Sequence, residues 1–164
     1  MKRVLFLFLM SFLLLLFGCL KDVDKSNENN QTMNLTWFYK KITDYEKVIS
    51  QSWCKAGESY YLWLSQYYKY THQYKKSLDI LKDLADCYPA AYKEKTIKLK
   101  LLLHNIWAVY EEWARYLKQK GDKHYKEKYQ KAKEAFQNII DIFSWTKLLS
   151  EDEIRWYKER IKWY

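Results

Sequence analysis

Glycine and proline, on which tight turns depend, are almost absent from this chain, with three Gly and one Pro in 164 residues. β-Sandwiches, barrels and Gly-rich phosphate-binding enzymes need many such turns, so the scarcity argues against all three classes. Apolar residues make up 49% and aromatic residues 19%, more than a disordered chain carries. We therefore expect an all-α protein whose length suits one domain or slightly more.

Apolar residues recur at helical spacing from residue 35 onward. This spacing predicts six helices, over about 35–53, 58–70, 74–87, 93–119, 124–143 and 150–164. Pro89 is expected to stop the third helix, because proline lacks the N–H that a helix interior needs. The chain is therefore expected to form a series of helices joined by short turns.

Two of these helices carry further signals. The fourth is apolar almost all round over 99–110, so we expect it to be the central and most buried helix. The last follows Ser150, with Glu153 three residues later. This spacing predicts a capping box at its N-terminus.

The N-terminus has the pattern of an export signal. Lys2 and Arg3 precede an apolar run from Val4 to Phe17, broken only by a serine. As a helix the run would reach only about 21 Å, against about 30 Å for a bilayer core. That length suits the apolar region of a signal peptide.

The run ends in Gly18-Cys19, and here the chain resembles a bacterial lipoprotein signal, with a small residue directly before a cysteine. The resemblance implies cleavage before Cys19, attachment of a diacylglyceryl group to its thiol, and anchorage to a membrane through that lipid. The chain then divides into a signal peptide (1–18), a lipidated cysteine with a polar tether (19–34) and a helical domain (35–164). The alternative is an uncleaved apolar anchor.

The chain carries a formal charge of +9. An exported protein does not normally meet nucleic acid, so we expect no nucleic-acid partner. Attraction to anionic lipid headgroups or to an acidic partner is the functional interpretation of the charge. AT-rich coding, which favours lysine, asparagine, isoleucine and tyrosine, is an equally good explanation.

An internal repeat is the most informative feature of the domain. Two sets of residues follow the same steps of 3, 4, 3 and 4. They are Tyr74, Ser77, Leu81, Leu84 and Tyr88 in the third helix, and Tyr129, Ala132, Phe136, Ile139 and Phe143 in the fifth. With the second and fourth helices as partners, these faces predict two stacked antiparallel helical hairpins.

The first hairpin resembles a tetratricopeptide repeat (TPR). The residues that carry the resemblance are its large aromatics, small contact residues, bulky residues and final proline: Tyr61, Leu64, Ser65, Tyr68, Tyr74, Ser77, Leu81 and Pro89. His72 stands where the family has a turn glycine. The second hairpin matches less well, and a generic stack of α-hairpins is the alternative.

The TPR resemblance implies peptide binding on the concave side of the stack. In the first hairpin that side would be lined by Ser59, Leu62, Gln66, Lys69 and Tyr70. An aromatic and an aliphatic side chain would supply desolvated contact area, and the lysine could meet a carboxylate. The alternative is that Leu62 and Tyr70 pack on neighbouring helices.

A narrower resemblance covers 74–110, which looks like the outer-membrane assembly lipoproteins of the β-barrel assembly machinery (the BamD type). That family also has a lipidated cysteine followed by TPR hairpins, and its hairpin helices often end in Tyr-Pro, here Tyr88-Pro89. This chain has two hairpins where the family has about five. The resemblance implies a non-catalytic protein–protein adaptor in the bacterial cell envelope, with the β-barrel assembly machinery as partner. The periplasmic face of the outer membrane is favoured.

A surface-exposed lipoprotein that binds an external ligand is the alternative function. Its candidate contacts are aromatic side chains near the C-terminus, where Trp145, Trp156 and Trp163 are the tryptophans most expected to show an exposed edge. These rings could contact a partner protein or lie at the level of lipid headgroups.

Catalytic and metal-binding patterns are missing from the sequence. His72, His104 and His124 lie far apart, without metal-ligand spacing, and there is no Cys-x-x-Cys or Gly-x-Ser-x-Gly. His104 is expected to be a core histidine without a carboxylate neighbour, and Glu111-Glu112 a solvated face. We therefore expect no catalytic residue, metal or cofactor; an enzyme with an unrecognised site is the alternative.

Cys54 and Cys87 remain as a pair once Cys19 is lipidated. They flank one helical hairpin, and antiparallel helices bring the two ends of a hairpin together. Export makes a disulfide permissible, so a bond between them is one prediction. Two small buried thiols are the alternative.

Overall fold

A computed structural model describes residues 35–92 and 96–164. Those residues form helices and connecting turns, with no strand among them, which confirms the all-α class. The predicted signal peptide (1–18), the lipidation site Cys19 and the tether (19–34) lie outside the described residues. Residues 35–40 are helical and belong to one contact unit. Lys41–Tyr164 forms a second unit, to which the rest of the description refers.

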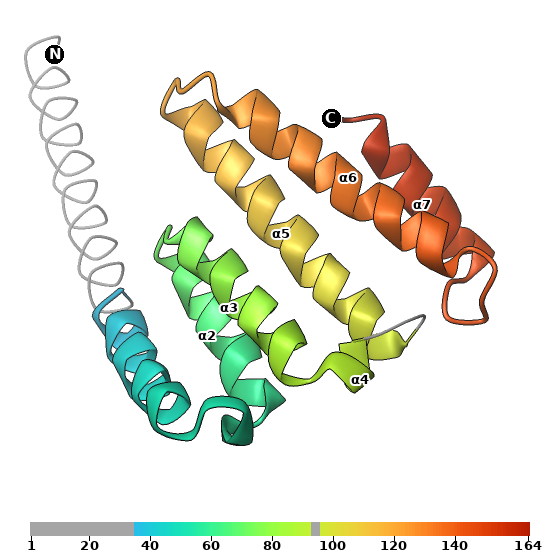
Figure 1. Cartoon of the computed structure of the whole chain (residues 1–164). Coiled ribbons are helices and arrows are strands. Elements are labelled where there is room, and N and C mark those ends of the chain that lie inside the picture. Colours follow the sequence, from blue (N-terminus) through green and yellow to red (C-terminus); the bar gives the residue numbers. More distant parts are fainter. Residues whose placement is uncertain (1–34, 93–95) are drawn as a thin grey trace, which may run out of the picture. The chain divides into compact units, whose positions relative to one another are not determined.

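The second unit consists of helices joined by short turns (Figure 1). Residues 41–52 are helical and lead into a 3₁₀ turn, η1. The elements are η1 (Trp53–Ala56), α2 (Glu58–Tyr70), α3 (Tyr74–Cys87), α4 (Pro89–Tyr92), α5 (Ile97–Gln119), α6 (Tyr125–Phe143) and α7 (Glu151–Ile161). The predicted bounds of α2 and α3 agree at every residue, because Gly57 and the polar 71–73 turn interrupt the helical pattern there.

The first hairpin, α2 with α3, is held together by a close approach of two serines. Ser65 and Ser77 are fully buried, and their hydroxyl oxygens lie 2.9 Å apart. Ser77 also donates a hydrogen bond to the Ser65 carbonyl oxygen over 2.8 Å. Small side chains allow the helices to approach, and the mutual hydrogen bonds satisfy two hydroxyls that would otherwise be costly to bury.

The turn between α2 and α3 contains a strained residue. His72 has φ 59°, in the left-handed region that glycine adopts more easily. Its ring stacks on Tyr116 of α5 at 4.5 Å, and its Nδ1 lies 2.8 Å from the Tyr74 hydroxyl. These contacts offset the conformational cost and join the turn to the second hairpin.

Helix α3 ends at Cys87, two residues before Pro89, as predicted, and Pro89 itself begins the short helix α4. Proline is well suited to the first position of a helix, where its missing N–H would have no partner. The next helix, α5, then begins at Ile97 and not near residue 93. Its N-cap is Thr96, whose hydroxyl accepts a hydrogen bond from the Leu99 N–H over 3.1 Å.

Helix α5 packs against α3, α4 and α6, so its predicted central position is correct (Figure 1). The prediction that it is the most buried helix is wrong. Leu101 is 54% exposed, whereas Lys100 and Glu111 are buried. These three neighbouring helices cover only part of the surface of α5, which leaves Leu101 exposed. Lys100 and Glu111 are buried because their ion-pair partners lie in α7, far away in the sequence, so the periodicity of α5 does not reveal them.

The second hairpin, α5 with α6, and α7 enclose an aromatic core. Phe136 is fully buried, with Trp107 stacked on it at 4.4 Å and Tyr157 at 5.1 Å. Helix α7 runs antiparallel to α6, since Tyr164 lies against Tyr129 and Tyr157 against Phe136. The buried residues of the predicted α6 face thus form the core beneath α7.

The capping box predicted at the start of α7 is confirmed. The Ser150 hydroxyl accepts a hydrogen bond from the Glu153 N–H over 3.2 Å, and the Glu153 carboxylate accepts one from the Ser150 N–H over 2.9 Å. Through the described part of the chain, every helix is too short or too polar to span a bilayer.

Replacing the cap serine tests this description of α7. Ser150→Ala is expected to lower the free energy of unfolding by about 1 kcal/mol, because the Glu153 N–H loses its partner. Urea denaturation followed by circular dichroism measures the change. Ser50→Ala, at an exposed site within a helix, is the control and is expected to change stability by less than about 0.5 kcal/mol. Equal effects of the two substitutions would contradict the assignment.

Candidate binding groove

A groove of about 370 Å³ lies between α2 and α5, the first helices of the two hairpins. Three residues predicted to bind peptide line it, together with three that sequence reasoning missed. Its lining residues are Ser59, Leu62, Trp63, Gln66, Leu101 and Asn105. Leu62, Trp63 and Gln66 follow Ser59 by three, four and seven residues, so the four lie on one face of α2.

The groove exposes large apolar side chains to solvent. Trp63 and Leu101 are each 54% exposed, and Leu62 is half-buried between the two helices. Exposed tryptophan and leucine side chains at a concave surface are typical of contact sites for other proteins. The sequence contains a signal for one of the missed residues, Trp63. It falls outside the apolar stripe of Tyr61, Leu64 and Tyr68, so a large apolar side chain is expected on another face of the helix.

An amide pair bridges the two helices at the groove. Gln66 Nε2 donates a hydrogen bond to Asn105 Oδ1 over 2.7 Å, and Asn105 Nδ2 donates to the Leu101 carbonyl oxygen over 2.8 Å. Each amide nitrogen carries two hydrogens, so each amide has a further donor beyond the one used here. The pair can therefore hydrogen bond to a peptide backbone lying in the groove.

The other two predicted peptide-binding residues, Lys69 and Tyr70, are not among the lining residues. They lie about one turn further along α2, where the Lys69 ammonium is 5.3 Å from the centre of the Tyr70 ring. Burial lowers the pKa of Lys69, although Glu112 on α5 acts in the opposite direction. Tyr70 is 53% exposed, so neighbouring residues cover about half of its side chain.

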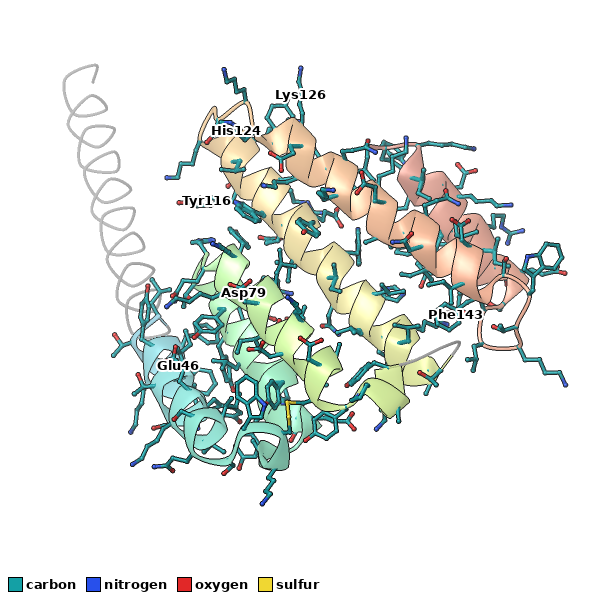
Figure 2. The ribbon with its side chains drawn as sticks, in the orientation of Figure 1. Glu46, Asp79, Tyr116, His124, Lys126 and Phe143 are labelled. Atoms are coloured by element: carbon teal, nitrogen blue, oxygen red, sulfur yellow. A yellow bond between two sulfur atoms is a disulfide. The ribbon has the colours of Figure 1, made fainter. Side chains whose placement is uncertain are left out.

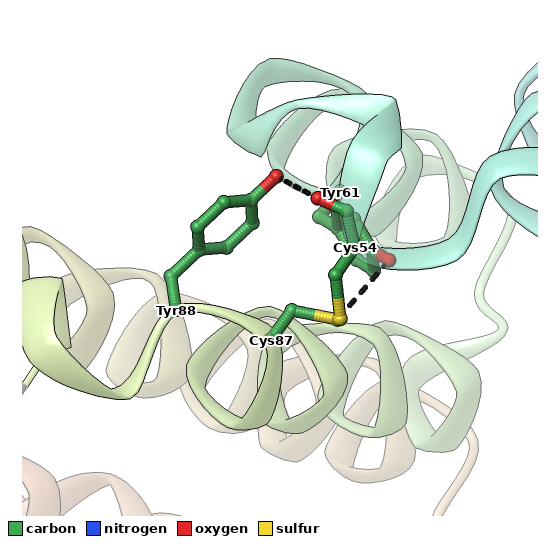
Figure 3. Close-up of a disulfide and its surroundings, with 4 residues drawn as sticks. All are labelled: Cys54, Tyr61, Cys87 and Tyr88. Carbon is green, nitrogen blue, oxygen red and sulfur yellow. Dashed lines mark hydrogen bonds between the residues drawn. A yellow bond between two sulfur atoms is a disulfide. The ribbon is translucent and has the colours of Figure 1, made fainter.

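The structure joins Cys54 and Cys87 through a disulfide (Figure 3). Two tyrosines flank it: the Tyr61 hydroxyl lies 3.5 Å from Cys87 Sγ, and the Tyr88 hydroxyl donates a hydrogen bond to the Cys54 carbonyl oxygen. The bond ties η1 to the end of α3. A closed loop of this length stabilises a fold by about 3–4 kcal/mol in the chain-entropy model.

The three histidines do not come together in a common site. His72 contacts Tyr116, His124 lies beside Asp122 at 2.7 Å, and His104 hydrogen bonds to Tyr157. Over residues 35–92 and 96–164, no three His, Cys, Asp or Glu side chains are arranged to hold a metal ion.

The surroundings of His104 differ from the prediction, because a carboxylate lies near it. Glu153 on α7 favours the charged imidazole, but burial and the nearby Lys100 outweigh it and lower the pKa of His104. Burial also raises the pKa of Tyr157 to about 12. A neutral imidazole paired with a neutral phenol is a structural contact that holds α7 to α5.

The prediction that Glu111 and Glu112 form a solvated face is wrong for Glu111. Its side chain is buried and pairs with both Arg160 of α7 and Arg115 of its own helix. Glu112 is exposed. The two neighbours differ because successive helical residues point in directions about 100° apart, and α7 covers only one of those directions.

The chain matches no protein-family model. No curated protein matches it. No solved structure matches it.

The adjacent glutamates provide a matched test of the ion cluster. Glu111→Gln is expected to lower the free energy of unfolding by about 2 kcal/mol, because the half-buried Arg160 loses its charged partner. Glu112→Gln is expected to cost less than about 0.5 kcal/mol. Urea denaturation of both variants measures the difference, and equal costs would contradict the pairing.

The lowered pKa of His104 predicts a pH dependence of stability. The unfolded histidine titrates near pH 6.5, so at about pH 6 the unfolded chain binds more protons than the folded chain. The free energy of unfolding is thus expected to fall as the pH drops below about 6.5 toward the lowered folded pKa. Urea denaturation between about pH 5.5 and 7.5 measures the slope.

His104→Gln is expected to flatten this slope, because it removes the group responsible for it. His124→Gln, at an exposed site, is the control and is expected to keep the slope. A wild-type slope that persists in His104→Gln would rule out His104 as its source.

Proposed function

We propose that this protein is a lipid-anchored, non-catalytic adaptor that binds a segment of another protein in the groove between α2 and α5. The observation that carries the proposal is the exposure of Trp63 and Leu101, one on each helix, next to an amide pair that bridges the two helices. Apolar contact area flanking a few hydrogen-bonding groups is the usual composition of a peptide-binding groove.

The two kinds of side chain have separate roles in this proposal. Trp63 and Leu101 would lose water when an apolar side chain of the partner enters between them, which supplies affinity. Gln66 and Asn105 would hydrogen bond to the partner's backbone and set its position. Because backbone groups are common to all sequences, the side chain that enters the groove would determine specificity.

The proposed location is the bacterial cell envelope, with the periplasmic face of the outer membrane favoured. It is supported by the lipoprotein-like signal ending in Cys19 and by the resemblance of 74–110 to the BamD type. The resemblance of the first hairpin to a TPR supports a protein partner, and the β-barrel assembly machinery is the specific partner proposed.

A surface-exposed lipoprotein that binds an external ligand is the second candidate. The exposure of Trp145 (92%), Trp163 (81%) and Trp156 (50%) favours it, because exposed tryptophans can stack on a ligand. Treatment of intact cells with protease separates the two candidates. Degradation there would support the surface location, and protection would support the periplasmic one.

The partner can be identified by purifying the lipidated protein from gently solubilised native membranes. Recovery of the β-barrel assembly protein would support the assembly role. Trp63→Ala combined with Leu101→Ala is then expected to weaken partner binding by about 10- to 100-fold, because the groove loses both apolar walls.

The matched control for the groove variant is Trp145→Ala, which removes an exposed tryptophan far from the groove in the sequence. It is expected to leave partner affinity unchanged within about twofold. Affinities are measured by titrating each variant with the purified partner. Equal affinities for the groove and control variants would overturn the groove as the binding site.

A further inference from the structure

We propose that one end of the helical unit, where the α2–α3 and α5–α6 turns lie, is a surface that binds anionic phospholipid and faces the membrane. The proposal rests on the membrane anchorage proposed above. It adds a second contact with the bilayer, through headgroup phosphates, and thereby an orientation of the domain.

Positive charge is concentrated at this end. The segments 69–76 and 118–128 contain eight lysines and two carboxylates, a formal charge of +6 of the chain's +9. We call these eight lysines the basic end; they are Lys69, Lys75, Lys76, Lys118, Lys120, Lys123, Lys126 and Lys128. Most of their side chains are exposed, as clustered headgroup contacts require.

Contacts between the two hairpins bring these segments to the same end. His72 of the first turn stacks on Tyr116, and Tyr74 stacks on Trp113 at 5.8 Å. The Lys128 ammonium lies 4.3 Å from the centre of the same Trp113 ring. Figure 2 shows His124 and Lys126 beside the α5–α6 turn, with Phe143 at the opposite end of α6. The basic end is therefore one surface built from both hairpins.

The charges of α3 run against the helix dipole. Its first turn has no acidic residue and contains Lys75 and Lys76, and its last turn has no basic residue and contains Asp86. Helix α7 has the favourable order, with acidic residues first and basic residues last. Lysines at a helix N-terminus reduce helix stability, so the helix dipole does not account for their position on α3. Lys76 has one contact within the fold, since its ammonium lies 5.3 Å from the centre of the Tyr68 ring.

The chain enters the unit at the basic end. The helical residues 41–52 run antiparallel to α2. Near the end of α2, Tyr68 donates a hydrogen bond to Glu46. Near the start of α2, Tyr61 contacts Cys87, which is bonded to Cys54. Residue 41 therefore lies toward the end of α2 that leads into the 71–73 turn. The second unit therefore begins near its basic end.

Exposed aromatic side chains lie at the same end. Tyr70 is 53% exposed at the close of α2, and Trp163 is 81% exposed just after α7. Trp163 lies just beyond the end of α7 that faces the start of α6, since the next residue, Tyr164, contacts Tyr129. The Tyr164 hydroxyl also accepts a hydrogen bond from Trp107 in the middle of α5, so Trp163 lies toward the basic end and not at its tip. Tyrosine and tryptophan favour the headgroup region of a membrane, so these rings complement the lysines.

Lysine labelling of the full lipidated chain tests the proposal. The protein is reconstituted into vesicles of phosphatidylcholine alone or with about one third phosphatidylglycerol, and treated with an amine-reactive reagent. We expect labelling of Lys75, Lys76, Lys123 and Lys126 to fall at least about threefold in the anionic vesicles only. The exposed Lys82 and Lys147 serve as controls and are expected to be labelled equally in both.

Salt dependence and a charge-reversal variant sharpen the test. Protection is expected to disappear at about 1 M salt, where charges are screened beyond about 3 Å. The variant Lys75→Glu/Lys76→Glu/Lys123→Glu/Lys126→Glu leaves Lys118 and Lys120 of the basic end to be labelled, and it is expected to abolish their protection in anionic vesicles. Its melting temperature is expected not to fall, since α3 gains acidic residues in its first turn. The control variant carries Lys→Glu at the exposed positions 55, 82, 147 and 158, an equal change in charge, and is expected to keep the protection.

The outcomes separate this inference from the anchorage on which it rests. Flotation of the protein with both kinds of vesicle reports anchorage, so failure to float would overturn the anchorage itself. Flotation with equal labelling in both vesicles would overturn only the lipid-binding surface. Protection in native membranes but not in protein-free anionic vesicles would also overturn it, and would indicate an acidic protein as the partner.

Discussion

The packing of α5 between α3 and α6 is the constraint on which the rest of the unit depends. It joins the two hairpins, provides one wall of the groove and brings the two hairpin turns to one end. Because α3 and α6 cover only part of its surface, α5 keeps apolar residues such as Leu101 in contact with solvent. The proposed binding groove is thus a consequence of how this helix is covered.

Helix α7 packs against α5 through ion pairs as well as through apolar contacts. Glu153 pairs with Lys100 at 2.6 Å, and Arg160 pairs with Glu111. Two charged residues of α5 are buried and would be unfavourable without these partners. The His104–Tyr157 contact lies between the two pairs, so polar and charged contacts hold α7 to α5 along its length.

The groove and the basic end are separate surfaces with different physical characters. The groove offers apolar area and amide hydrogen bonds, which favour a polypeptide, whereas the basic end offers clustered ammonium groups, which favour phosphate, and exposed aromatic rings, which favour the headgroup region. A membrane contact at the basic end would leave the groove available to a partner. The same small domain would then hold a partner at a defined orientation to the bilayer.

Much of the fold was predictable because helices are encoded locally. The bounds of α2 and α3, the pairing of the hairpins and the capping box at Ser150 follow from apolar spacing and from a few turn and cap residues. Three of the groove residues, Ser59, Leu62 and Gln66, were also predicted. Trp63, Leu101 and Asn105 were missed, because their role depends on which helix faces α2.

The sequence by itself determined the all-α class, most helix boundaries and the concentration of lysines in two segments, since these depend on residues close together in the chain. Only the tertiary structure decided that Glu111 is buried while Glu112 is exposed, that Cys54 meets Cys87, and that the two lysine-rich segments share one end. Each of these depends on contacts between helices distant in sequence. The periodicity of one helix identifies its apolar face but not the neighbour that covers it.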